Sequence, residues 1–461
     1  MTANYRTFAL KSYETTKMGS PRTVAFHTLG CKLNFSETSS LQRMFEDHGY
    51  EVAEAFDHAD VFVLNTCSVT DFADRKCRKF VRRVLRQNPD ARVVVTGCYA
   101  QLKPEEIADM EGVDLVLGAA EKFRMLDYID QLDGAKSKGM VHTSEITELS
   151  TFNHAFSFGD RTRSFLKVQD GCDYNCSFCT IPQARGRSRS NTIEQVVADA
   201  RSIGASGIRE IVLTGVNLGD FGNGEEITTT RDLRGKVVRT QKQERFIDLI
   251  QALDAVEEID RFRISSIEPN LCTEEIIDFV AHSRRFMPHF HMPLQSGNNK
   301  QLADMRRRYR RELYADRVAR IKSVMPHACI GVDVIVGFPG ETDEDFLETV
   351  AFIEGLDVSY LHVFTYSERD NTLAATMEGK VSMNKRRKRN EILRNLSEEK
   401  KRKFYLEHCG EIRPVLLEPG KDPGRLTGWT DNYIRLDVDS DAGAVNWIRD
   451  LKIEEHALIY D

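Results

Sequence analysis

The stretch GCDYNCSFC, residues 171–179, sets three cysteines close together in the chain. They are Cys172, Cys176 and Cys179, in the spacing C-x3-C-x2-C. A structural zinc site or an ordinary iron–sulfur cluster uses four thiolates, so one ligand is missing here. Single buried cysteines are common, but a triplet with a glycine before it and an aromatic residue before its last cysteine rarely arises by chance. We interpret the stretch as a metal-binding loop.

Three thiolates on a tight loop can hold three irons of a 4Fe–4S cube and leave the fourth iron without a protein ligand. A catalytic metal site keeps such an open position for its substrate. S-adenosylmethionine (SAM) can chelate that iron through its amino and carboxylate groups. An electron from the cluster then cleaves a sulfur–carbon bond and releases a 5′-deoxyadenosyl radical. The loop resembles the signature of radical SAM enzymes, with the cofactor as the missing ligand.

Around this loop, residues 161–383 repeat a strand followed by a helix about six times. The expected strands span 164–169, 209–215, 261–267, 289–294, 330–337 and 360–366, and the clearest helices span 192–204, 245–256, 311–325 and 343–355. Six such units make an open, partial TIM-like barrel, an α/β fold in which chemistry lies at the carboxyl ends of the strands. The cysteine loop follows the first strand, where this rule places it.

Residues 21–140 show a second α/β pattern. The strands TVAFHT, VFVLNT and RVVVTG alternate with helices, which predicts a doubly wound parallel sheet. Cys31, Cys67 and Cys98 each follow one of these strands. Because the carboxyl ends of parallel strands meet at one edge, the three thiols could converge on a second cluster. The alternative is three buried structural cysteines.

The remaining segments are predicted from composition. Residues 1–20 are expected to form a tail and residues 141–160 a polar linker. Residues 222–243 are expected to form either a mobile insertion or a small hairpin. Residues 404–461 alternate short strands with turns, which indicates a small all-β barrel packed on the central domain.

The segment 384–403 is strongly basic. It holds ten Lys or Arg and three Asp or Glu, a balance of +7, so the rest of the chain carries −14. Such segregation favours a helix that faces a polyanion, with the run Lys400–Lys403 among the expected phosphate contacts. The alternative is an ordinary solvated helix.

Composition indicates a globular cytoplasmic protein. The chain has 461 residues, 41% of them apolar, and ten scattered cysteines that do not form a disulfide framework. Met1–Ser20 lacks the apolar core of a signal peptide, and no apolar run approaches the ~18 residues of a membrane span. Its thiols are therefore expected to be reduced and free to bind metal.

Several longer stretches resemble the methylthiotransferase family of radical SAM enzymes. They are GCDYNCSFCTIPQARGRSRS, HFHMPLQSGNNKQLADM, GVDVIVGFPGETDEDF and TYSERDNTLAA. The sheet with Cys31, Cys67 and Cys98 resembles that family's second cluster domain. The closing LLEPG…GRLTGWTDNYIRL resembles its RNA-binding TRAM barrel. The resemblance implies two 4Fe–4S clusters, with sulfur carried or attached at the N-terminal one.

The resemblance also implies a substrate. RISSIEP, residues 263–269, is similar to enzymes that add a methylthio group to C2 of N6-threonylcarbamoyladenosine at position 37 of tRNA. The partners implied are the tRNA anticodon stem-loop, a low-potential electron donor and a sulfur source. Alternatives are the isopentenyladenosine-type tRNA enzyme, the enzyme acting on an aspartate of ribosomal protein S12, and an iron–sulfur RNA-binding or electron-transfer protein without turnover.

Barrel logic and the resemblance nominate cofactor-binding residues at the strand ends. Phe178 is expected to cover the adenine, Thr214 and Asn217 to bind the methionyl amino group, and Arg187 to bind a carboxylate or phosphate. The other candidates are Ser266, Glu268, Gln295 and Val336. The run Arg185–Arg189 could also serve the carboxylate of a threonylcarbamoyl group. The remaining cysteines and one histidine are expected to be structural: Cys77, Cys272, Cys329, Cys409 and His289.

Overall fold

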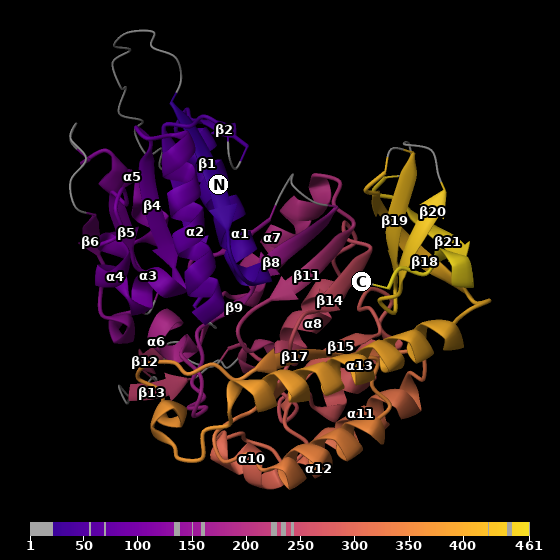
Figure 1. The fold of residues 1–461 in the computed structure, drawn as a ribbon. Helices are drawn as coiled ribbons and strands as arrows, with labels where there is room; N and C mark the ends of the chain where they lie inside the picture. The colour runs from indigo at the N-terminus through magenta and orange to yellow at the C-terminus, as the bar shows by residue number, and fades with distance from the viewer. Residues whose placement is uncertain are drawn as a thin grey trace.

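The structure is a computed structural model that describes residues 22–460, with gaps. The gaps are 55–56, 69–70, 133–138, 150, 158–161, 223–227, 232–236, 241–243, 423 and 440–444. The expected tail 1–20 lies outside the described residues. Figure 1 shows the N-terminal sheet beside the central strands, with a small sheet at the C-terminal end of the chain.

The N-terminal part is a six-stranded parallel sheet in the order β2-β1-β3-β4-β5-β6. Its strands are β1 Thr23–Thr28, β2 Glu51–Ala53, β3 Val61–Thr66, β4 Arg92–Gly97, β5 Leu115–Leu117 and β6 Met140–His142. Its helices are α1 Lys32–Asp47, α2 Asp71–Gln87, α3 Cys98–Leu102, α4 Pro104–Ala108 and α5 Met125–Ile129. Two separate apolar clusters form its core. The predicted doubly wound α/β domain is therefore confirmed.

The strand order reverses direction between β1 and β3. β1 pairs with β2 on one side and with β3 on the other, and β4 then continues outward from β3. In doubly wound sheets such a reversal opens a crevice at the carboxyl ends of the strands, where ligands bind. Cys31 and Cys67 lie directly after the two strands at this crevice.

The central part contains the six predicted strands as an open parallel arc. They are β8 Arg163–Lys167, β11 Glu210–Thr214, β14 Arg261–Ile264, β15 His289–Gln295, β16 Cys329–Val336 and β17 Tyr360–Thr365. A bridge between Phe262 and Phe286 joins the β8-β11-β14 half to the β15-β16-β17 half. The surrounding helices are α7 Ile193–Ala205, α8 Phe246–Asp254, α9 Glu274–His282, α10 Asn299–Asp304, α11 Arg311–Val324 and α12 Asp343–Glu354. The partial six-unit barrel is confirmed.

Strand alternation decides which side chains face the inside of the arc, which we call the lumen. Leu213, Ile264 and Val332 belong to the large apolar core formed with the helices. Because successive residues of a strand point to opposite faces, the residues between them face the lumen. Many of these are polar, among them Glu210, Arg263 and Asp333. The lumen is therefore suited to a polar ligand.

The expected linker 141–160 is more structured than its composition indicates. β6 begins at Met140 and completes the N-terminal sheet, and β7, Ala155–Phe156, pairs antiparallel with β8. Strands of two or three residues are too short to show the alternation by which strands are recognised. In the 222–243 insertion, β12 Thr228–Arg231 and β13 Val237–Thr240 form an antiparallel hairpin, and the other residues apart from Gly222 lie outside the described parts.

The basic segment lies within one long helix, α13 Met383–Glu407, packed against β17 and β16. After it, β18 Ile412–Pro419, β19 Arg425–Thr430, β20 Arg435–Asp439 and β21 Ile448–Lys452 form an antiparallel sheet in the order β20-β19-β18-β21. Among the described residues of this sheet, an isolated bridge between Leu436 and Leu458 brings its edges toward closure. The all-β character is confirmed, and a closed TRAM-type barrel stays a prediction. Nowhere in the described chain is a helix long and apolar enough to cross a membrane.

Candidate functional site

The cysteine loop leaves the first barrel strand through β9, Gln169–Asp170, and turns at Gly171. Gly171 has φ +69°, and a Cβ there would lie 1.9 Å from the backbone oxygen of Arg187, so only glycine fits this turn. Backbone N–H groups of Tyr174 and Ile181 donate to the sulfurs of Cys172 and Cys179, each at 3.4 Å. Burial raises the pKa of both thiols to about 12. Burial without a metal therefore disfavours the charged thiolates. A metal ion bound in place of the protons would compensate that charge, because metal ligation requires the thiolate.

Arg307 is a functional residue that the sequence analysis missed. Its Nη1 lies 3.2 Å from the sulfur of Cys176, and its Nη2 pairs with the carboxylate of Glu268. Burial raises the pKa of Glu268, although Arg307 opposes that shift. Arg307 thus connects the cysteine loop to the segment that follows β14 and places a positive charge beside the sulfur of Cys176.

Asn217 supports the predicted cofactor site. Its side chain is 3% exposed, and neither its amide oxygen nor its amide nitrogen has a partner among the described residues. The hydroxyl of Thr214 is likewise buried without a partner. A buried polar group left unpaired costs about 1–3 kcal/mol, so this spot suits a polar ligand. The side chain of Gln169 ties the segment to the cysteine loop, since it accepts from the Val216 and Asn217 N–H groups and donates to the Gly171 oxygen.

The other predicted cofactor residues lie around the same end of the barrel. Gln295 ends β15 at a register shift and has φ +67°, a strained conformation of the kind that gathers at functional sites. Ser266 follows β14 and is half-buried. Phe178 packs edge-on against Phe338, with ring centroids 6.4 Å apart. Val336 is buried in the core that faces the helices, whereas Ile335 and Phe338 form the apolar surface beside Phe178.

The structure brings the loops of Cys31, Cys67 and Cys98 to one edge of the N-terminal sheet. Gly30, with φ +110°, lies so close to Cys67 that an added Cβ would be 2.6 Å from the Cys67 Cβ. β3 and β4 pair up to Thr66 and Gly97, the residues before the other two cysteines. The residue types and the convergence of these loops fit the three-thiolate site that the sequence predicts.

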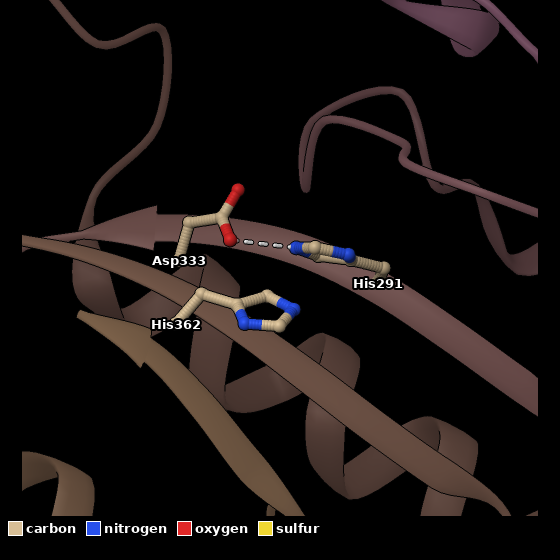
Figure 2. A group of neighbouring side chains, drawn as sticks. All are labelled: His291, Asp333 and His362. Carbon is tan, nitrogen blue, oxygen red and sulfur yellow. Dashed lines mark hydrogen bonds and ion pairs between the residues drawn. The ribbon is translucent and has the colours of Figure 1, made fainter. Parts of the chain in front are cut away.

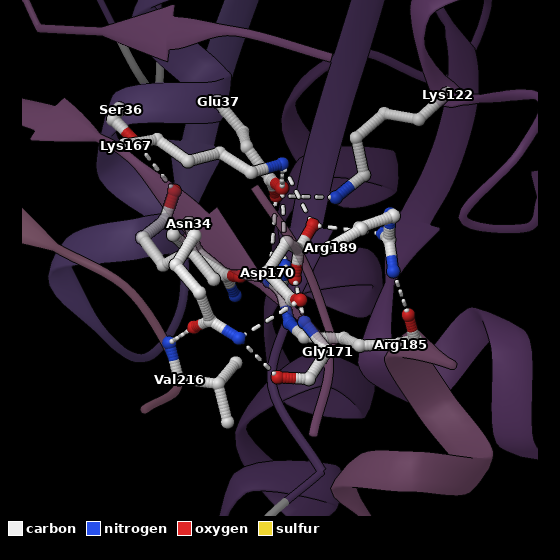
Figure 3. A network of polar contacts seen from close by, with 12 residues as sticks. Asn34, Ser36, Glu37, Lys122, Lys167, Asp170, Gly171, Arg185, Arg189 and Val216 are labelled. Atoms are coloured by element: carbon white, nitrogen blue, oxygen red, sulfur yellow. Dashed lines mark hydrogen bonds and ion pairs between the residues drawn. The ribbon is translucent and has the colours of Figure 1, made fainter. Parts of the chain in front are cut away.

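A buried network of charges joins this edge to the barrel (Figure 3). Glu37 on α1 receives Lys122 at 2.6 Å, Lys167 at 3.0 Å and Arg185 at 3.1 Å. Asp170, directly before the cysteine loop, binds Lys167 and Arg185 as well. The charges of Glu37, Cys98 and Asp170 raise the pKa of Arg185 although burial would lower it. Arg185 therefore lies between the two groups of cysteines.

The same network determines which arginines of the run Arg185–Arg189 are free to bind a ligand. Arg185 is held by Glu37 and Asp170, and Arg189 pairs with Asp170 at 3.0 Å. Arg187 is exposed, and its guanidinium contacts no polar group in the described part of the chain. Of the three arginines, only Arg187 is available for an anionic ligand.

A second buried contact joins the two domains beside Cys67. Arg369, which follows β17, pairs with Asp74 at 2.9 Å and donates to the Ser68 hydroxyl at 2.5 Å. The relative position of the two groups of cysteines is therefore fixed from two sides.

The lumen holds further polar side chains. His291, Asp333 and His362 come from β15, β16 and β17 and point toward one another (Figure 2). His291 Nε2 lies 2.8 Å from an Asp333 oxygen, and one ligand atom from each residue lies within 4.8 Å of the others. His289 lies two residues before His291 on the same face of β15. Its Nε2 is 3.2 Å from the Tyr360 hydroxyl, as expected for a hydrogen-bonded structural histidine.

The lumen also holds a cavity of about 250 Å³ between the N-terminal domain, the barrel and the terminal sheet. Lys32, the residue after Cys31, lines it. Burial and the charges of Arg163 and Arg263 lower the pKa of Lys32 to about 8. Lys32 makes no hydrogen bond or ion pair with any described residue.

The four cysteines expected to be structural are buried or half-buried. Cys77, Cys272 and Cys329 are fully buried, and burial raises the pKa of each thiol to about 12. Cys409 is half-buried, and its sulfur lies 3.7 Å from the Tyr405 oxygen.

Helix α13 uses many of its basic residues inside the protein. Arg386 and Arg389 are buried in ion pairs with Glu368 and Glu341. Lys400 donates to the backbone oxygens of Glu354 and Leu356 at the end of α12. The basic residues exposed without a described partner include Arg387, Lys388 and Arg394. Of the predicted phosphate contacts Lys400–Lys403, Lys400 is thus occupied within the protein, while Arg402 and Lys403 are exposed.

Two family models match the chain. Residues 23–118 match the model described as uncharacterized protein family UPF0004, and residues 166–353 match the radical SAM superfamily. Among solved structures, a radical S-adenosylmethionine methyltransferase from Kitasatospora setae with cobalamin and a [4Fe-4S] cluster bound has a TM-score of 0.54. The two are 15% identical, and the match covers 77% of each chain, so this likeness concerns the fold.

Curated relatives match nearly the whole chain. The threonylcarbamoyladenosine tRNA methylthiotransferase of Bacillus subtilis is 40% identical over 421 residues, 90% of each chain. The one of Aquifex aeolicus is 38% identical over 90% of this chain and 96% of its own. A tRNA-2-methylthio-N(6)-dimethylallyladenosine synthase of Fusobacterium nucleatum is 32% identical over 85% of this chain and 87% of its own.

Proposed function

The chain belongs to the threonylcarbamoyladenosine tRNA methylthiotransferase family of radical SAM enzymes, and we propose that it adds a methylthio group to C2 of N6-threonylcarbamoyladenosine at position 37 of tRNA. The observation that carries the proposal is the buried junction between two three-cysteine sites on two domains. A site that carries sulfur and a site that activates a base must face the same substrate. The Glu37 and Arg369 contacts hold the two sites side by side.

The barrel site would hold one 4Fe–4S cluster through Cys172, Cys176 and Cys179. When bound there, the cluster and SAM would supply one-electron cleavage of a sulfur–carbon bond. Asn217 and Thr214 would bind the polar methionyl end of the cofactor with their unpaired buried groups. Phe178, with Ile335 and Phe338 beside it, would pack on the adenine.

The remaining predicted cofactor residues would position the cluster loop and the cofactor. Arg307 and Glu268 would orient the cysteine loop. Arg187, Ser266 and Gln295 would contact the polar parts of the cofactor. Val336 would support this site from the core behind it.

The N-terminal site would hold a second 4Fe–4S cluster through Cys31, Cys67 and Cys98. Arg185 supplies positive charge beside Cys31 and Cys98. Burial raises the pKa of the Cys31 thiol, and the charge of Arg185 opposes that rise. The proposal includes a low-potential electron donor, a sulfur source and a cytoplasmic location. It also divides the chain into a cluster domain 21–140, a radical SAM domain 161–383, the helix segment 384–403 and a TRAM-like RNA-binding domain 404–461.

The proposal is tested by product analysis. The protein is reconstituted anaerobically with iron, sulfide and a reductant, and is incubated with SAM and tRNA that carries threonylcarbamoyladenosine. Mass spectrometry of the digested nucleosides should find its 2-methylthio derivative. A methylthio group on isopentenyladenosine alone, or on ribosomal protein S12 alone, would replace the proposed substrate. SAM cleavage without any methylthio product would remove the transfer step.

The threonylcarbamoyl substrate is favoured over the isopentenyl one by two observations. The two relatives described above that act on threonylcarbamoyladenosine are 38–40% identical to the chain, against 32% for the dimethylallyladenosine synthase described above. The cavity beside Cys31 is also lined by Lys32, Arg163 and Arg263, and an apolar isopentenyl group would gain nothing from these cations.

A further inference from the structure

The cavity in the lumen is lined by more cationic than anionic side chains. Lys32, Arg163 and Arg263 line it, and the nearby carboxylates are Glu210 and Glu418. Arg263 is satisfied by Glu210 and by the backbone oxygens of Thr430 and Asp431. Lys32 alone has no described partner. A cation that faces a cavity among other cations favours an anion in that cavity.

A second polar group in the cavity wall also lacks a partner. His289 is 4% exposed and lines the cavity, and its Nδ1 makes no hydrogen bond to a described residue. Its Nε2 is occupied by the Tyr360 hydroxyl. The cavity therefore offers a positive charge from Lys32 and a neutral hydrogen-bonding atom from His289.

The cavity has the position and size that a substituent of the substrate base requires. It runs from Ser265, just beyond the carboxyl end of β14, to Arg163 and His289, at the amino ends of β8 and β15. Its wall on the other side is Gly30 and Lys32, the residues that flank Cys31. At about 30 Å³ for each water in the liquid, 250 Å³ holds several waters or one group the size of an amino acid.

We propose that this cavity is the subsite for the threonylcarbamoyl group, with Lys32 binding its carboxylate and His289 Nδ1 binding its hydroxyl. The inference rests on the proposed function and names the residues that select this substrate. A base near the strand carboxyl ends would direct its N6 substituent down the lumen, while its C2 edge stays near Cys31 and the cysteine loop. The carboxylate and the hydroxyl of the threonyl part complement the positive charge of Lys32 and the hydrogen-bonding atom of His289.

The test is a cycle of one change in the protein and one in the RNA. Lys32→Met keeps the length of the side chain and removes its charge. An anticodon stem-loop with threonylcarbamoyladenosine is compared with the same RNA whose threonyl carboxylate is a methyl ester. Binding to the reconstituted protein is measured at fixed salt. Because hydrogen bonds to charged groups contribute more than neutral ones, the ester should weaken binding to the wild type by about tenfold or more. It should have little effect on Lys32→Met.

The controls separate this contact from other effects. Lys322→Met removes a lysine on α11 that pairs with Asp357 on the outside of the barrel, and it should respond to the ester as the wild type does. Iron content is measured for each protein, because Lys32 follows Cys31. If Lys32→Met loses iron, Lys32→Arg should keep the preference for the free carboxylate.

Two results would overturn the subsite. One is equal binding of acid and ester by the wild type, which would mean that the carboxylate meets no cation. The other is an ester effect of the same size in wild type and Lys32→Met, which would place the carboxylate elsewhere. A backbone phosphate in the cavity would give the first result. Failure of the proposed function is seen separately, as absence of methylthio product from the unesterified substrate.

Discussion

At the scale of single residues, Arg307 connects features that lie far apart in the sequence. It reaches Cys176, which precedes it by 131 positions, and Glu268, which precedes it by 39. The cysteines and Asn217 could be predicted because strand ends in barrels have a known role. Arg307 could not, because it stands in the run MRRRYRRE, where nothing distinguishes one arginine from the next. Only the fold shows that this guanidinium is buried and its neighbour Arg310 is exposed.

We predict that Arg307→Met weakens the hold on the barrel cluster. The change leaves Glu268 buried without its cation, and loss of one partner of a buried ion pair costs about 3–5 kcal/mol. Iron should therefore leave the reconstituted protein about ten times faster or more in the presence of a chelator. Arg310→Met, on an exposed arginine close by, should behave as the wild type. Equal release rates from all three proteins would show that Arg307 does not stabilise the loop.

At the scale of elements, strand–helix periodicity gave the six barrel strands but not the contacts between domains. β6 and β7 are too short to show a period, and they lie in the segment expected to be a linker. The alternation of strands and helices predicts helix α1, but it does not predict that Asn34 and Glu37 on this helix are buried. Sequence alone does not show that their partners, Lys167 and Arg185, arrive from another domain.

We predict that Glu37→Gln loosens the junction in a pH-dependent way. Although burial alone would raise it, Arg185, Lys122 and Lys167 hold the pKa of Glu37 well below its usual value. A depressed carboxyl pKa stabilises the fold above the unfolded value of about 4.3, and this stability is lost as pH falls through the folded pKa. At pH 7 the melting temperature should therefore fall by about 5 °C or more. The difference from wild type should narrow below about pH 4.

The matched control for that variant is Glu46→Gln on the same helix. The Glu46 side chain is exposed, and within the described part of the chain its carboxylate accepts a hydrogen bond from Gln42 alone, at 3.3 Å. Its melting temperature should follow the wild type at every pH. A Glu37→Gln difference that stays constant from pH 7 to pH 4 would mean that the Glu37 charge is not what stabilises the junction.

Helix α13 yields a prediction about RNA. Arg387 and Arg394 line a shallow groove of about 380 Å³ that also includes Thr365, the last residue of β17. The exposed end of the helix therefore lies toward the carboxyl ends of the barrel strands. Changing Arg387, Lys388 and Arg394 to Gln should weaken tRNA binding and lower the slope of log affinity against log salt by about 2, if each cation meets one phosphate.

The control uses two basic residues of α13 that already have partners in the protein, the half-buried Lys400 and the exposed Lys403. Lys400 donates to two backbone oxygens, and Lys403 pairs with Glu407 at 3.7 Å. Changing both to Gln should leave the salt slope unchanged. If instead the Lys400 and Lys403 changes lower the slope and the Arg387 group does not, the RNA lies on the far half of the helix.

At the scale of the whole molecule, the two cysteine sites belong to different domains that share one boundary. The terminal sheet docks at the opposite end of the barrel, where Arg261 and Arg263 donate to the backbone oxygens of Trp429, Thr430 and Asp431. The proposed substrate site is therefore enclosed by three parts of the chain: the Cys31 loop at the side, the cysteine loop at one end and the terminal sheet at the other. This arrangement suggests a division of labour that can be tested on the intact chain.

We predict two clusters for each chain after anaerobic reconstitution, one lost with each set of cysteines. Changing Cys31, Cys67 and Cys98 to Ala should halve the iron and abolish methylthio transfer. SAM should still be cleaved to 5′-deoxyadenosine, because Asn217, Arg307 and the cysteine loop all belong to the barrel. Cys409→Ala, on a half-buried cysteine outside both sites, should keep all the iron. A folded N-terminal triple variant with unchanged iron would show that its domain binds no cluster. A folded triple variant that keeps half the iron but cleaves no SAM would show that the two domains do not act separately.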